Sequence, residues 1–477
     1  MPGMALALAP VGGGVLAPED RARLEERARA AVLRARSRGE PMLAAVTVAA
    51  APGTDPSAVA FASRRPGERW FCWEQPEREG TALAAVGCLR ALEASGTDRF
   101  HAVAEEWRRL AAGALLDERR ALVAVGGFAF APEGGSSPAW EGFPPACLSV
   151  PEVAIARRGQ DVRVTLAALV APDDTPEDVA ARIEGRAREL RAPSLPLLDP
   201  APAAAARIAS AMPPEHYVEA VARAVERIRR GDFDKVVLAR AVEVHAGADH
   251  DPAAVFGVLR EAFPGCYVVC VGMGEGALTM ASPELLVRRD GARASTVALA
   301  GSTRRSADPA VDDHLGEQLL RSAKDRSEQA IVARAIQRTL ARRAVWVTAP
   351  PEPVVVRMAN IQHLATPIRA QLAEPVAAVD LAGLLHPTPA VGGEPREAAV
   401  AAIPALEGLD RGWYAGPVGW TDAGEDGEFC VALRCALLRG RLARCFAGDG
   451  VVRDSDPAAE LAETEVKLEA LLPVLAG

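Results

Sequence analysis

The chain has 477 residues, 49% of them hydrophobic and 25% charged, and a formal net charge of −9. This composition is ordinary for a globular protein, and the acidic balance argues against a nucleic-acid-binding protein, whose surface needs a basic patch. The sequence shows neither a secretory leader with a positive start nor an apolar run of membrane-spanning length. We therefore expect a cytoplasmic protein with no membrane partner.

The length exceeds that of a usual single core, which favours one large α/β unit or two closely packed halves. Helices are predicted over 17–38, 80–93 and 99–112, and strands at 42–50, 119–130 and 161–170. A segment rich in proline and alanine, 191–216, is the best boundary. It divides the chain into an N-terminal half, 1–205, and a C-terminal segment, 206–477.

The C-terminal segment begins with a predicted helix over 216–230, which ends at Gly231, a residue suited to a C-cap. Apolar and branched residues predict strands within 234–244, 265–274, 277–291 and 292–305. A long helix is predicted over 312–342, and glycine-rich turns dominate 386–427. A hairpin is predicted at Gly440, and a last helix starts at about Pro457, after the capping residue Asp456.

The eight cysteines form no CxxC pair, and the seven histidines form no HxxxH or HxH cluster. The cysteines are therefore expected to be reduced and mostly buried, because metal and redox sites need closer spacings. Any metal is expected to be bound through oxygen.

The last helix carries acidic residues on two opposite sides. With an advance of about 100° per residue, Glu460, Glu463 and Lys467 share one sector, whereas Glu465 and Glu469 lie roughly opposite. A surface helix needs only one solvated face, so one stripe should point inward, where carboxylates need a cation or hydrogen bonds. The alternative is a solvated helix with a Glu463–Lys467 ion pair.

The long helix shows a similar anomaly at Glu328, which lies on the core-facing stripe with Ile331 and Val332. An ion pair with Lys324, one turn earlier, would be the simpler explanation. Two helices with misplaced glutamates suggest instead that they face each other across a hard cation such as Mg²⁺, which prefers carboxylate oxygens.

Three further charged residues lie among apolar ones. Lys235 is either at the solvated start of its strand or desolvated, and a desolvated lysine has a lowered pKa and can act as a base. Glu284 is either exposed after a Ser-Pro turn or buried with a raised pKa, as a general acid requires. Arg434 alternates with apolar residues, and a buried arginine usually binds a carboxylate. The glycine loops 299–302 and 447–450 offer amides to an anion, which is a weak signal.

Ten segments carry a resemblance to a known family: FDKVVLAR, SPELL, TVALAGSTRR, KDRSEQ, IQHLATPI, LHPTPAVGGEP, RGWYAGPVGW, EFCVALRCA, AGDGVV and SDPAAELAETEVK. They occur in the order seen in chorismate-utilising enzymes, and the chain closely resembles the isochorismate synthases of the menaquinone or catecholate-siderophore type. The matching motifs are closely spaced over about 210–477. Before this region the resemblance is weak and rests mainly on the motif GGFAF. It implies an α+β fold like that of anthranilate synthase component I, with two stacked β-sheets flanked by helices and completed by the N-terminal half.

The resemblance also implies a reaction, the conversion of chorismate to isochorismate. Lys235 would activate water to attack C2 of the ring, and Glu284 would protonate the departing C4 hydroxyl. Mg²⁺ would be bound by Glu328 and Glu463, with Glu460 nearby through water, and would hold the ring carboxylate.

The remaining matches concern substrate binding. Arg434 and Tyr414 match positions that hold the enolpyruvyl carboxylate. Lys467 and the loops around Gly301, Ser302 and Gly448 match positions around the bound anion.

Subfamily differences favour isochorismate as the product. Anthranilate synthases usually have glutamine in place of Lys235, and aminodeoxychorismate synthases often have a nucleophilic lysine in place of Ala300. Neither feature is present, so no glutaminase partner is expected. We expect the protein to be a monomer. Salicylate synthases tend to carry threonine near Ala390, and the alanine here favours stopping at isochorismate.

Two departures from the family pattern leave alternatives open. Gln329 replaces a common histidine, and Asp449 replaces a small residue of the motif AGAG. Both lie beside proposed metal ligands. The alternatives are a salicylate synthase, which would also release pyruvate, and a non-catalytic chorismate-binding relative weakened at these two positions.

Overall fold

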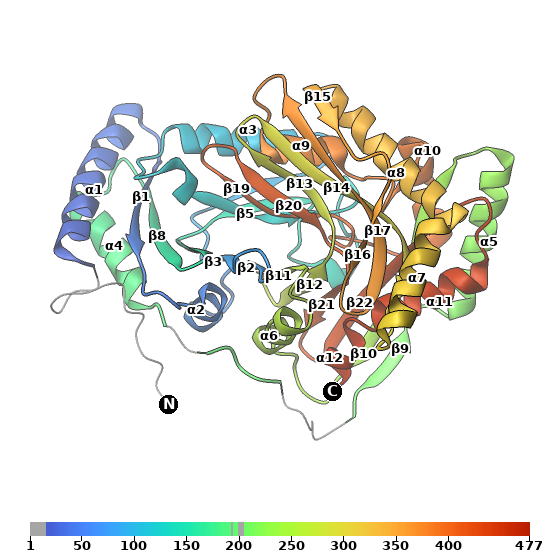
Figure 1. The fold of residues 1–477 in the computed structure, drawn as a ribbon. Helices are drawn as coiled ribbons and strands as arrows, with labels where there is room; N and C mark the ends of the chain where they lie inside the picture. The colour runs from blue at the N-terminus through green and yellow to red at the C-terminus, as the bar shows by residue number, and fades with distance from the viewer. Residues whose placement is uncertain (1–15, 192–193, 199–204) are drawn as a thin grey trace.

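Two antiparallel β-sheets form the centre of the computed structural model, which describes residues 16–191, 194–198 and 205–477, and helices flank them (Figure 1). The predicted α+β fold with two stacked sheets is confirmed. Both sheets take strands from either side of residue 205.

Within the described residues the larger sheet has twelve strands. In sheet order these are β1 (Met42–Ala49), β8 (Asp161–Val170), β7 (Val153–Arg158), β3 (Thr81–Val86), β2 (Trp70–Gln75), β11 (Tyr267–Met273), β12 (Gly276–Ser282), β21 (Cys435–Arg439), β22 (Leu442–Val451), β10 (Lys235–His245) and β18 (Gly393–Glu394), with β9 (Arg207–Ser210) also pairing with β10.

The second sheet has ten strands in the same described part of the chain. Their order is β15 (Ala344–Thr348), β17 (Ile361–Leu372), β14 (Arg293–Arg304), β13 (Leu285–Asp290), β20 (Gly427–Val431), β19 (Pro417–Asp422), β5 (Val123–Phe128), β6 (Ala146–Val150) and β4 (Arg90–Ala94), with β16 (Val354–Arg357) also pairing with β17.

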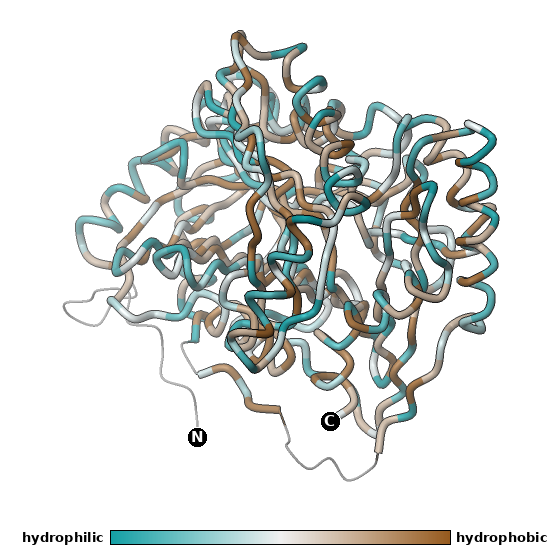
Figure 2. The backbone as a smooth tube through the Cα atoms, turned by 45° about the vertical axis from the view of Figure 1, so that its right-hand side comes forward, coloured by the Kyte–Doolittle hydropathy of each residue, from teal (hydrophilic) through white to brown (hydrophobic). Residues whose placement is uncertain are grey.

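The α-helices lie outside the sheets, and Figure 1 shows α1 and α4 at one end of the molecule and α5, α7, α8 and α11 at the other. Their bounds are α1 (Pro18–Arg38), α2 (Pro56–Ser63), α3 (Arg99–Ala112), α4 (Pro176–Arg188), α5 (Pro214–Arg230), α6 (Pro252–Ala262), α7 (Pro309–Arg321), α8 (Ala323–Ala341), α9 (Ala378–Leu385), α10 (Arg396–Glu407), α11 (Pro457–Leu468) and α12 (Leu472–Ala476). Figure 2 shows the outer helices alternating between hydrophilic and hydrophobic residues, as expected when one face is buried.

Several predicted signals have the expected structure. Gly231 ends α5 with φ +86, and Gly440 turns the β21–β22 hairpin with φ +54. The side chain of Asp456 caps α11 by accepting a hydrogen bond from the Ala459 amide at 2.9 Å. No helix within the described ranges is long and apolar enough to cross a membrane.

The secondary structure predicted for three segments was wrong. Residues 80–93 form β3 and the start of β4 instead of a helix, because this alanine-rich segment is paired inside the sheet and turns at Gly87, with φ +83. The long helix is two helices, since Ser322 is extended and its hydroxyl caps Asp325 at the start of α8. Residues 386–427 contain α10 as well as turns.

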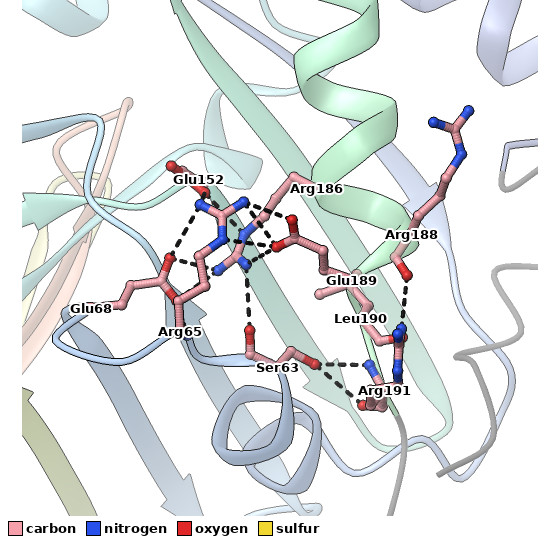
Figure 3. A network of polar contacts seen from close by, with 9 residues as sticks. All are labelled: Ser63, Arg65, Glu68, Glu152, Arg186, Arg188, Glu189, Leu190 and Arg191. Atoms are coloured by element: carbon pink, nitrogen blue, oxygen red, sulfur yellow. Dashed lines mark hydrogen bonds and ion pairs between the residues drawn. The ribbon is translucent and has the colours of Figure 1, made fainter. Parts of the chain in front are cut away.

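Salt bridges join the N-terminal helices away from the site (Figure 3). The Arg186 side chain, 5% exposed, contacts Glu68 at 2.8 Å, Glu152 at 2.9 Å and Glu189 at 2.7 Å. These contacts fix α4 against the turn before β2.

Two of the passages between the sheets lie next to each other. The chain passes from β12 to β13 after Ser282, and from β20 to β21 after Val431. The two crossings are bonded together, since the Val431 amide donates to the Glu284 carbonyl at 3.1 Å and the Ser282 hydroxyl donates to the Val431 carbonyl at 2.6 Å. The two segments that carry Glu284 and Arg434 therefore lie side by side, although they are distant in sequence.

Candidate active site

A cavity opens between the sheets where these crossings meet β10, β14, β22, α8 and α11. Its lining includes ten of the twelve predicted site residues: Glu284, Gly301, Ser302, Glu328, Ala390, Tyr414, Arg434, Gly448, Glu463 and Lys467. The other two lie behind the lining: Lys235 contacts it through Glu328, and Glu460 offers an oxygen within 4.8 Å of those of Asp449 and Glu463. The structure thus brings the predicted residues together from segments up to about half the chain apart.

Lys235, the first residue of β10, is completely buried. Its Nζ lies 2.8 Å from Oε1 of Glu328, an ion pair whose angles do not meet those of a hydrogen bond. The predicted alternative of a solvated strand start is therefore wrong, and so is the Glu328–Lys324 pair. A Cβ on Gly450 would lie 2.8 Å from Cε of Lys235 and collide with the Glu328 carboxylate, so the pair needs glycine opposite it.

Glu284 lies at the crossing before β13 and is 3% exposed. Burial raises its pKa to about 8, even though the nearby Lys235 lowers it. The predicted buried carboxyl with a raised pKa is confirmed, and the side chain is largely protonated at neutral pH.

Acidic residues gather beside the Lys235–Glu328 pair. Asp449, Glu460 and Glu463 each offer one oxygen, and these oxygens lie within 4.8 Å of one another. The inward stripe of α11 is therefore that of Glu460 and Glu463, whereas Glu465 is exposed. Carboxylate oxygens at this spacing fit a hard dication. The sequence predicted Glu328, Glu460 and Glu463 as the metal-binding acids. The three clustered acids in the structure are instead Asp449, Glu460 and Glu463.

Lysines approach the same acids. Lys324 donates to Glu460 at 2.7 Å, and Lys467 lies 3.0 Å from Glu463 and 3.1 Å from Asp449. Burial and the neighbouring Glu463 raise the pKa of Asp449. Although burial opposes it, the pKa of Glu463 is lowered, mainly by the charge of Lys467.

The loop at Gly301 is shaped by a β-bulge. The register of β14 against β17 shifts between Ala300 and Ser302, and Gly301 has φ +74, which glycine adopts without strain. The bulge turns the Ser302 hydroxyl toward Glu463, to which it donates a short hydrogen bond.

The opposite wall is built around Arg434, which follows the second crossing and has φ +47, a strained conformation for arginine. Its Nη2 donates to Nε2 of His363 at 2.8 Å, and the other ring nitrogen of His363 donates to the Gly301 carbonyl at 3.3 Å. Burial and Arg434 lower the pKa of His363 to about 3, so the ring is neutral and accepts from the guanidinium. Tyr414 completes this wall, with its ring stacked on Phe446 at 5.1 Å.

Two polar residues of the cavity lining, His363 and Asp449, were not among the site residues predicted from the sequence. His363 stands in the quoted segment IQHLATPI, and its place as a polar residue in an otherwise buried strand was the available signal. Asp449 was noted only as a departure, because its distance from α11 depends on the tertiary fold. Gln329 points away from the lining, donating to the Thr366 hydroxyl at 2.6 Å.

The sequence matches a known protein family over most of its length. The family model described as chorismate binding enzyme matches residues 29–476. The chain belongs to the chorismate binding enzymes. It is 40% identical over 405 residues to the salicylate biosynthesis isochorismate synthase of Pseudomonas aeruginosa, covering 85% of this chain and 84% of that one.

Solved structures of chorismate binding enzymes agree with the fold. MenF, the menaquinone-specific isochorismate synthase from Escherichia coli, matches with a TM-score of 0.77 and 27% identity, covering 95% of this chain and 100% of that chain. Anthranilate synthase component I from Streptococcus pneumoniae matches with a TM-score of 0.62 and 21% identity, covering 75% of this chain and 81% of that chain, which shows the shared fold alone.

Proposed function

We propose that the protein is a Mg²⁺-dependent isochorismate synthase, an isomerase that converts chorismate into isochorismate. The Pseudomonas aeruginosa relative and Escherichia coli MenF are both named isochorismate synthases, and each match spans most of both chains. The observation that carries the proposal is a carboxyl with a raised pKa, Glu284, in the cavity wall, together with a buried amine, Lys235, that contacts the lining residue Glu328 from behind that wall.

Lys235 and Glu284 have complementary tasks. In its neutral form Lys235 takes a proton from water as the oxygen bonds to C2 of the ring. The ring double bond shifts, the C4–O bond breaks, and Glu284 gives its proton to the leaving hydroxyl, which departs as water. One water enters and one leaves, so the reaction is a balanced isomerisation that needs no other reactant. Burial serves Glu284, because it favours the neutral form that holds the proton to be donated.

Glu328 and Glu463 are the proposed ligands of Mg²⁺, and Glu460 is proposed to act through water. The bound ion would supply positive charge that holds and neutralises the ring carboxylate of chorismate. The donor set fits this role, since Glu328, Glu460 and Glu463 all offer carboxylate oxygens, those of Glu460 and Glu463 within 4.8 Å of each other, and Mg²⁺ commonly retains waters beside one or two carboxylates.

The enolpyruvyl carboxylate is proposed to bind Arg434 and Tyr414. Nη2 of Arg434 donates to neutral His363 and Nη1 donates a long bond of 3.4 Å to Asn360, and the other N–H groups of the guanidinium suit a carboxylate. Lys467 and the backbone at Gly301 and Gly448 are proposed to complete the anion site, with Ser302 and Ala390 in the lining.

One assay tests the function. Purified protein is incubated with chorismate and Mg²⁺, and isochorismate, salicylate and pyruvate are separated. Isochorismate without pyruvate supports the proposal. Release of pyruvate would show a salicylate synthase, and unchanged chorismate would show a non-catalytic relative. We propose that the isochorismate feeds menaquinone or siderophore synthesis.

A further inference from the structure

The site contains four carboxylates but only three neighbouring lysines among the described residues. Among the described residues, Glu328 has Lys235, Glu460 has Lys324, and Glu463 has Lys467 as its nearest lysine, at distances of 2.8, 2.7 and 3.0 Å. Asp449 is the fourth carboxylate, and the lysine it touches is already shared with Glu463.

The two oxygens of Asp449 differ. Oδ1 accepts from the amide of Gly450 at 2.7 Å and lies 3.1 Å from Nζ of Lys467. Oδ2 is buried and has no hydrogen-bond partner, and the residue is only 6% exposed. An unpartnered oxygen on a buried carboxylate costs free energy unless a cation meets it.

The position of Asp449 identifies the cation that would meet it. The residue lines the cavity, and its carboxylate lies within 4.8 Å of the offered oxygens of Glu460 and Glu463. Oxygens on opposite sides of one Mg²⁺ or Ca²⁺ are roughly 4–5 Å apart. Gly448 and Gly450 on either side leave room for no other side chain, since a Cβ on either would collide with its neighbours.

We propose that Asp449 is an additional ligand of the divalent ion, so that this chain holds its metal with an aspartate from β22 as well as the glutamates of α8 and α11. This inference rests on the proposed magnesium site. The extra carboxylate adds negative charge where the ion binds and should therefore tighten metal binding relative to a site with a small residue at this position.

The test measures metal binding without substrate, using Mn²⁺ as the probe, followed by electron paramagnetic resonance, and Mg²⁺ by calorimetry. Asp449→Asn keeps the shape of the side chain, and Asp449→Ala gives a second variant with a small residue. Asp454→Asn, an exposed aspartate of the same segment, is the matched control. We expect Kd to rise about tenfold to a hundredfold in both Asp449 variants and to stay unchanged in the control.

Thermal unfolding supplies a second readout. Without metal, Asp449→Asn should be about as stable as the wild type, because the amide keeps the shape of a side chain whose Oδ2 has no hydrogen-bond partner, whereas saturating Mg²⁺ should raise its Tm less than that of the wild type. Equal Kd values for wild type and both variants would overturn the inference, as would a wild type that binds neither ion. Isochorismate formation by the wild type is scored separately, so an active wild type with equal Kd values refutes the ligand role of Asp449 alone.

Discussion

Nζ of Lys235 and Oε1 of Glu328 lie 2.8 Å apart, joining the start of β10 to α8. The proposed base and a proposed metal ligand are therefore direct neighbours, and both are buried. Their two roles can still be separated, because a base acts on the rate of the chemical step and a ligand acts on metal affinity.

Lys235→Ala is expected to lower kcat by about 10²–10⁴-fold, the usual contribution of a general base. Chorismate binding should change little, because Lys235 does not line the cavity. Lys235→Arg should be equally impaired, since a guanidinium stays protonated. Steady-state kinetics and calorimetry with chorismate measure the two effects. A variant with turnover close to that of the wild type would show that another group is the base.

Glu284→Gln should abolish turnover, because the amide has no proton to give. In the wild type, kcat should fall as pH rises through about 8, the pKa to which burial raises Glu284. A rate profile between pH 6 and 9.5 measures this fall. A flat profile across pH 8 would argue against Glu284 as the acid.

The same carboxyl should affect stability. Its pKa is raised from 4.5 in the unfolded chain to about 8, so the native state binds the proton more tightly. The stabilising contribution is therefore fully present below about pH 4.5 and is lost as pH rises through about 8. Urea unfolding should show the wild type losing stability relative to Glu284→Gln over this range. A constant difference would contradict the assigned pKa.

Glu463→Gln should weaken Mg²⁺ binding and reduce turnover at limiting Mg²⁺. Glu469→Gln is its control, because this residue is exposed at the end of the same helix. Chelation should abolish the activity of the wild type and added Mg²⁺ should restore it. The assignment fails if both variants need the same Mg²⁺ concentration as the wild type.

Arg434→Lys is expected to raise KM for chorismate by about tenfold or more, because a lysine cannot bond His363 and a carboxylate with one planar fork. The kcat at saturation should fall less than KM rises. Initial rates over a range of chorismate concentrations separate the two. An unchanged KM would place the enolpyruvyl carboxylate elsewhere.

Gly450→Ala should reduce activity at least tenfold and cost about 1–3 kcal/mol of stability, because its Cβ would displace Glu328 and Lys235. Gly185→Ala is the matched control, since a Cβ in that helix meets nothing within 4 Å. The control should be slightly more stable than the wild type and fully active. Equal activity of the two variants would contradict the packing described here.

Much of the site could be predicted because its residues break local patterns. Lys235 lies in an apolar strand and Glu328 on the core-facing stripe of a helix, and the sequence therefore raised burial of each as one of two alternatives. Their ion pair was not predicted, because it depends on how β10 meets α8. Asp449 shows the same limit, since its neighbours on α11 are brought to it by the fold. The alanine-rich segment 80–93 was misassigned because pairing within the sheet overrides helix propensity.

The central claim is that water, activated by Lys235, adds to C2 while the C4 hydroxyl leaves. The most direct measurement is the conversion of chorismate in ¹⁸O-labelled water, followed by mass spectrometry of the product. We predict isochorismate that carries one ¹⁸O atom, at the hydroxyl on C2. Unlabelled isochorismate would contradict the account, because the hydroxyl would then have moved within the substrate.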